Sequence, residues 1–350
     1  MNELDFTGLD LSGWEAFWQG LNTGDLFGGS LKEILSRLGD GSLFSQPGAL
    51  LELLKEAALA AFRQSFGAYG ALIAVAVVCA VIGILSDGRE GTSGAAGFLC
   101  FGMGAALVSY QMAALITLAR DTIVKLASFM ELAAPVLAVA LAAAGGAATS
   151  AGISPLAAFL GSAVAGVFKS VVLPLAMACA VCAVLSVVTE KGKLEHLFSL
   201  LKSAIKWLSG AVFTVYFGMV TMQGLTVART DSIALRTAKY TLDKSVPIIG
   251  GAMSGTLETV LSSAALVKNT VGAAALVTIV AIAAAPMLSI ACSGLACKGV
   301  AAICEPMGET KIPALLGKAS DVCNALFAVL TAVILMFMVT VGLALAAANP

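Results

Sequence analysis

The stretch RTAKYTLDKSVPIIGG, from Arg236 to Gly251, places several charged side chains within long runs of Ala, Val, Leu, Ile and Gly. Ionisable side chains in apolar surroundings are costly, so by default they mark a pathway or a contact with a partner. Pro247 and the pair Gly250–Gly251 would interrupt a helix here. These residue types therefore indicate recognition or passage of charged groups.

The wider region 229–272 reads as a helix, a break and a second helix that carries Glu258. Irregular backbone at membrane depth is tolerated only against protein or water, so the pattern resembles a re-entrant or cavity-lining element. A surface loop with two half-buried helices and solvated charges is the alternative. We predict these pathway or partner contacts: Asp231, Arg236, Lys239, Asp243, Lys244, Pro247, Gly250, Gly251, Glu258, Lys268, Asn269 and, further upstream, Glu131.

No catalytic constellation accompanies these residues. His196 is the only histidine, so a His-based triad cannot be built. Cys179 and Cys182 form C-A-V-C within an apolar run, which is typical of small core residues rather than a zinc or redox motif. The Gly-rich GREGTSG lacks the Lys-Ser/Thr of a P-loop. We expect no enzymatic activity, no cofactor and no metal, so any energy would come from a partner or a gradient.

The composition defines the fold class. Hydrophobic residues make up 59% of the chain and charged residues 12%, with a mean hydropathy of +0.97. Soluble domains average roughly 45–50% apolar and about 25% charged residues. We predict an all-α, polytopic integral membrane protein in contact with the lipid bilayer. The net charge of −1 provides no basic surface for nucleic acid.

Six to eight membrane segments are expected. Spans of bilayer length fall near 67–86, 95–118, 127–145, 209–228 and 324–347, and the Ala-Arg-Asp sequence at 119–121 is expected to close the second. Two longer apolar blocks lie at 153–189, interrupted by Lys169 and Pro174, and at 271–304, with Pro286 inside it. A straight helix over the first block would be about 55 Å long, against a hydrocarbon core of roughly 30 Å, so two short spans or a tight hairpin fit better. Two broken blocks can mark the internal repeats of transporters, although ordinary helix hairpins explain them too.

The N-terminal region, residues 1–65, is polar or amphipathic and precedes a membrane domain at 66–350. Trp14 and Trp18 are four residues apart, so they share a face if that stretch is helical. No signal peptide is visible at the start.

The segment 194–208 predicts an amphipathic helix, with Trp207 as an interfacial anchor and lysines on the polar face. It would lie on the membrane surface or pack across other helices of the chain. Its lysines and the basic residues of 229–244 both favour the cytoplasmic side, yet the single span 209–228 separates them. Either one basic group is external, which we favour, or this span does not cross fully.

The order of polar residues in 231–272 resembles the signature of the stage III sporulation protein AE family. The matching features are Asp231, L-R-T-A-K ending at Lys239, V-P-I-I-G ending at Gly250, T-V-L-S ending at Ser262, and K-N-T-V-G from Lys268 to Gly272. Two upstream segments, MELAAPVLAVALAAAGG and GAVFTVYFGMVTMQG, are also similar to the family. The likeness covers about residues 95–348. Members usually begin with a cleavable signal peptide; a processed start would put the N-terminal region outside the cytoplasm.

This resemblance implies a non-enzymatic subunit of the SpoIIIA–SpoIIQ channel complex, in the mother-cell membrane around the forespore during sporulation. Its implied partners are other proteins of the SpoIIIA operon, including a separate ATPase, and SpoIIQ. The signature region would then line a route through the membrane or dock a neighbouring subunit. A homo-oligomer of this chain is a further alternative. Two rival functions remain: a stand-alone secondary permease with Glu131, Glu258 and Lys268 as ligands, and a membrane scaffold without its own pathway.

Overall fold

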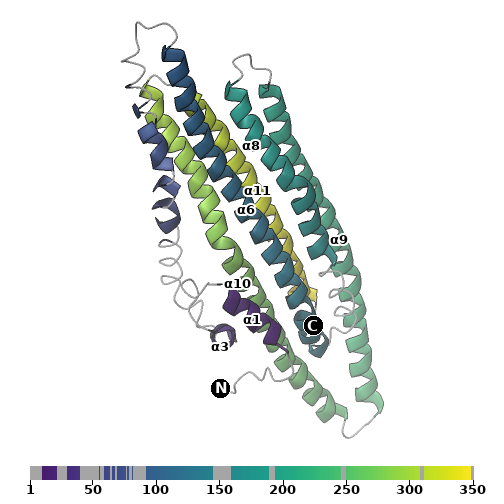
Figure 1. The fold of residues 1–350 in the computed structure, drawn as a ribbon. Coiled ribbons are helices and arrows are strands. Elements are labelled where there is room, and N and C mark those ends of the chain that lie inside the picture. Colours follow the sequence, from purple (N-terminus) through teal and green to yellow (C-terminus); the bar gives the residue numbers. More distant parts are fainter. Residues whose placement is uncertain are drawn as a thin grey trace.

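The chain is a bundle of long helices (Figure 1). The computed structural model describes residues 10–21, 30–39, 92–144, 159–188, 194–245, 250–307 and 311–347, with short pieces between 55 and 81. The helices are α1 (Ser12–Gly20), α3 (Leu31–Gly39), α6 (Thr92–Ala143), the π-helix η1 (Phe168–Val172), α8 (Leu173–Val188), α9 (Glu195–Ser245), α10 (Gly250–Cys304), the 3₁₀-helix η2 (Glu305–Met307) and α11 (Lys311–Ala347). No strand occurs in these ranges, which confirms the all-α prediction.

Five helices in the described ranges are long and apolar enough to cross a membrane: Phe101–Ala143, Phe159–Val188, Glu195–Met222, Ala265–Cys304 and Lys311–Ala346. This confirms a polytopic membrane protein. The longest has 43 residues and measures roughly 64 Å, about twice the hydrocarbon core. A helix of that length must tilt or continue beyond the hydrocarbon. The predicted span near 67–86 lies where only short pieces are described.

The two spans expected at 95–118 and 127–145 form one helix, α6. The Ala-Arg-Asp sequence at 119–121 was expected to close the first span, yet the helix continues through it. Arg120 and Asp121 are exposed, and neither residue type prevents helical backbone geometry. The two charged residues change the surface of α6, and its backbone remains helical.

The predicted hairpin within 153–189 is also replaced by one continuous helical segment, residues 159–188. The turn at η1 is widened to a π-helix just before Pro174. A proline lacks the N–H that would bond the carbonyl four residues back, so a looser turn accommodates it without ending the helix. Likewise, α10 runs through Pro286, so the block 271–304 is the later part of a single helix.

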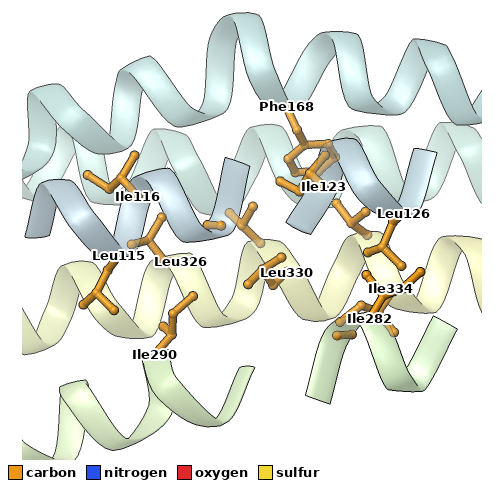
Figure 2. Packing of buried hydrophobic residues seen from close by; sticks show 14 of the residues in the cluster. Leu115, Ile116, Ile123, Leu126, Phe168, Ile282, Ile290, Leu326, Leu330 and Ile334 are labelled. Atoms are coloured by element: carbon orange, nitrogen blue, oxygen red, sulfur yellow. The ribbon is translucent and has the colours of Figure 1, made fainter. Parts of the chain in front are cut away.

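Close packing between α10 and α11 forms the centre of the bundle. The Ser320 hydroxyl donates a hydrogen bond of 2.9 Å to the Gly294 carbonyl. A Cβ added to Gly294 would lie 3.2 Å from the Cys323 Cβ, so the two backbones approach closely only because Gly294 has no side chain. Small residues allow such close approach, and packing drives helix association in lipid. Branched side chains fill the space between α6, α10 and α11 (Figure 2).

The N-terminal helices pack against this bundle beside α10 (Figure 1). Trp14 is 1% exposed, and its ring meets the Phe129 ring of α6 edge-on at 5.4 Å between centroids. Its indole Nε1 donates to the Thr278 Oγ1 of α10 at 3.3 Å. Trp18 is buried on the same helix, which confirms the shared face predicted for the two tryptophans.

We expect Trp14→Ala to loosen the N-terminal helices. Truncating a buried Trp to Ala costs about 3–5 kcal/mol, because a cavity is left behind. Tryptic cleavage after Lys32 and Arg37 of α3, followed by mass spectrometry, should become faster. Trp207→Ala is the matched control, because Trp207 is 79% exposed on α9. Equal cleavage rates in the two variants would contradict the role of Trp14.

Candidate functional site

The predicted break falls between two long helices. Helix α9 ends at Ser245 and α10 begins at Gly250, which confirms helix, break, helix; Pro247 lies outside the described residues. The predicted contacts Asp231, Arg236, Lys239, Asp243 and Lys244 lie on α9. Gly250, Gly251 and Glu258 lie on α10. The backbone therefore brings these positions together on the two arms of one helical hairpin.

The hairpin projects past the end of the bundle. Lys268 of α10 bonds the Leu345 carbonyl in the last turn of α11, so the part of α10 before Lys268 lies beyond α11. On α9, the Tyr216 hydroxyl is hydrogen-bonded to Thr340 of α11, which places residues after 222 at the same end. The α10 arm beyond the bundle is roughly 27 Å long. Figure 1 shows both arms continuing past the C-terminus. We call residues 229–245 and 250–267 the charged hairpin.

Lys268 and Gly272 anchor the base of the charged hairpin. The Lys268 side chain is fully buried, and its Nζ donates to the Leu345 carbonyl at 2.9 Å. The last carbonyls of a helix have no partner within it, so a lysine from another helix that reaches one satisfies it. One turn further along α10, a Cβ on Gly272 would lie 2.1 Å from Leu345 Cδ2. The first and last residues of K-N-T-V-G thus both contact Leu345, while Asn269 is exposed.

Two of the three ligands of the permease hypothesis, Glu131 and Lys268, lie on different helices in different surroundings. Glu131 is exposed on α6, Lys268 is buried against α11, and the Glu258 side chain lies outside the described residues. An apolar cavity of about 90 Å³ between α6, α8 and α11 is lined by none of the three; its wall includes Val108, Met112, Met177 and Leu315. Across the described ranges, no group of three or more His, Cys, Asp or Glu could hold a metal ion.

A charge network that the sequence did not reveal joins α9 to α11. Lys202 pairs with Asp321 at 2.7 Å, and Lys318 pairs with Glu195. Lys318 Nζ also donates to the Ser186 hydroxyl of α8 at 2.7 Å. The available signal was the spacing of Lys318 and Asp321, three residues apart and so on one helix face.

This network also bears on which side of the membrane the lysines of the segment 194–208 face. That segment is the start of α9, and its predicted apolar face packs against the bundle through Phe198 and Ile205, both buried. Lys202 is used in an ion pair within the chain. It therefore contributes less to a free cytoplasmic basic surface than its sequence position suggests.

We expect Lys268→Met to destabilise the base of the charged hairpin. The substitution keeps the length of the side chain but leaves the Leu345 carbonyl without this donor, which costs about 1–3 kcal/mol. A lower midpoint of thermal unfolding in detergent should follow. Lys298→Met is the control on the same helix, because Lys298 is exposed. A midpoint equal to that of the control would show that the buried hydrogen bond has no stabilising role.

We expect Gly272→Ala to destabilise the same contact by overpacking, at a cost of about 1–3 kcal/mol. Shortening the opposing side chain in the double variant Gly272→Ala, Leu345→Ala should recover part of that loss. The two single variants and the double variant form a cycle that thermal unfolding can measure. Additive effects in that cycle would mean that Gly272 and Leu345 do not constrain each other.

Comparison with known proteins supports the family resemblance. The family model for stage III sporulation protein AE matches residues 29–348. The chain is 31% identical over 244 residues to Stage III sporulation protein AE of Bacillus subtilis (strain 168), and the match spans 70% of this chain and 61% of that relative. No solved structure matches.

The matched range contains both arms of the charged hairpin, the Lys268–Leu345 contact and every long helix of the bundle. This chain therefore belongs to the stage III sporulation protein AE family.

Proposed function

We propose that this chain is a non-enzymatic membrane subunit of the SpoIIIA–SpoIIQ complex, needed for endospore development, with the charged hairpin as its docking element. It would reside in the mother-cell membrane around the forespore and work with a separate ATPase. Family membership supports the sporulation role. The observation that carries the docking role is the projection of the charged hairpin beyond α11.

The position of the charged hairpin favours docking over a route through this chain alone. Beyond the Lys268–Leu345 contact, α11 continues only to Ala347. Arg236 on α9 and Glu258 on α10 are each roughly 12–14 Å from the connection along their helices. Positions that carry residues of both charge signs thus lie at one height along the two helices, where a partner with complementary charges can bind.

The packing of the bundle supports this choice over a stand-alone permease. Lys268, a ligand in that hypothesis, is buried and bonded to a backbone carbonyl, and Glu131 is exposed on α6. The cavity between α6, α8 and α11 has apolar walls, which suit packing better than ion binding. The scaffold hypothesis shares the docking role and differs from our proposal in giving this chain no pathway of its own.

The test is co-isolation from the sporulating host during engulfment, in mild detergent, with Arg236→Ala and Glu258→Gln in the tagged chain at native expression level. Both variants should reach the membrane in normal amounts, yet form fewer heat-resistant spores and retain the ATPase about ten- to hundredfold less well, as expected for truncated contact residues. Lys206→Ala is the control, because Lys206 is exposed on the bundle portion of α9.

Normal sporulation and full co-isolation in both variants would overturn the docking role of the charged hairpin. Gradient-driven solute uptake by the purified chain in liposomes would instead favour the permease. A tagged chain recovered alone, and present in growing cells as well, would contradict the sporulation complex.

A further inference from the structure

Four exposed charged side chains interrupt the apolar outer face of α6. Arg120, Asp121, Lys125 and Glu131 all lie within the candidate membrane span Phe101–Ala143. In the part of the chain that the structure describes, none of the four forms an ion pair. They are therefore unlike Lys202, Asp321, Lys318 and Glu195, whose charges are paired between α9 and α11.

These four side chains form a band on one side of the helix. Helical periodicity puts Asp121 and Lys125 on neighbouring turns, and Arg120 and Glu131 are three turns apart, roughly 16 Å along the axis. The same face is apolar above and below the band, where exposed residues include Met103, Leu107, Tyr110 and Val139, while Leu132 lies against Gly13 of α1. The opposite face of α6, with Ile123 and Leu126, is buried in the bundle (Figure 2).

Lipid is a poor cover for such a band. Placing an Arg, Lys or Asp side chain in the centre of a bilayer costs about 2.5–3.5 kcal/mol each, and such residues generally face protein or water. A protein partner that neutralises them must supply both signs at one height, because Arg120 and Asp121 are adjacent. A partner with charges of one sign would leave a like-charge contact at one of the two positions.

A second copy of this chain meets that requirement. Two copies in one membrane can be related by a twofold axis along the membrane normal, which brings residues of equal height opposite each other. Arg120 of one copy then lies near Asp121 of the other, and the same pair forms again across the axis. Arg120 and Asp121 differ by only one residue in height, so this pair is complementary to its own copy. The apolar residues on either side would provide the rest of the contact.

We propose that two copies of this chain pack through the outer face of α6, with Arg120 of each copy paired to Asp121 of the other. This contact is separate from the charged hairpin, so docking of other subunits and self-association can be tested independently.

The first test is cross-linking in native membranes. Ser128 is exposed and lies two turns from Asp121 on the same helix, so Ser128→Cys should give a disulfide-linked dimer upon copper–phenanthroline oxidation. Ser203→Cys is the control, because Ser203 is exposed on α9. The unsubstituted chain controls for its native cysteines. A dimer specific to Ser128→Cys is the expected result; no dimer, or equal dimer from Ser203→Cys, would overturn the proposal.

The second test reverses the charges. Arg120→Asp or Asp121→Arg alone creates like-charge contacts at both symmetric pairs, so each should reduce the Ser128→Cys dimer by about tenfold or more. The double variant Arg120→Asp, Asp121→Arg restores opposite charges and should recover the dimer. Such recovery distinguishes a broken contact from a misfolded chain. If both single variants dimerise normally, or the double variant recovers nothing, the Arg120–Asp121 pairing is wrong.

A third measurement distinguishes a second copy of the chain from water as the cover of this face of α6. In the alternative, the chain is a monomer and water covers the band, so this part of α6 lies at the membrane–water interface. Without the oxidant, Ser128→Cys, which leaves Arg120 and Asp121 unchanged, would then react with a membrane-impermeant maleimide at the same rate as an exposed control, Ser12→Cys. We expect much slower labelling, because the second copy covers the position. Labelling at the control rate would overturn the proposal.

Discussion

The contact between Lys268 and the last turn of α11 sets where the bundle ends. Lysine is costly to bury, and here its amino group reaches a carbonyl that the end of α11 cannot satisfy by itself. With Gly272 making room for Leu345 one turn away, the end of α11 has a fixed position on α10. Everything before Lys268 on α10, and the matching arm of α9, consequently extends beyond the packed helices.

Small residues determine the rest of the packing in a similar way. At the other end of the α10–α11 pair, Gly294 and Ser320 bring the two backbones close enough for a side chain to bond a main-chain carbonyl. In lipid there is little hydrophobic gain from helix association, so such contacts and tight van der Waals packing select the neighbours. The charged pairs between α9 and α11 then attach a helix whose outer face is otherwise open.

The sequence predicted local features well, because they depend on neighbouring residues. Pro247 and the two glycines marked the break between α9 and α10, and the spacing of Trp14 and Trp18 marked a buried face. Continuity was harder to predict. Arg120 and Asp121 suggested the end of a span, and Pro174 suggested a break, whereas the backbone passes both by exposing the charges and widening one turn.

Contacts between distant residues could not be predicted by periodicity. Lys202 and Asp321 are far apart in sequence, and nothing in either segment specifies the other. The same holds for Lys268 and Leu345, although K-N-T-V-G is part of the family-like signature. The motif was read as a site for passage or docking, and its two end residues act in this chain as packing elements. Sequence order singled out Lys268 and Gly272 but did not indicate their contact with Leu345.

The charged hairpin can also be regarded as a lever. Its arms are stiff helices, and the nearest fixed point on α10 is Lys268, roughly 27 Å from the tip. A tilt of about ten degrees at that base would displace the tip by about 5 Å, close to one helical turn. A partner that pulls on the tip would thereby transmit force to the end of α11 through the contacts of Lys268 and Gly272 with Leu345.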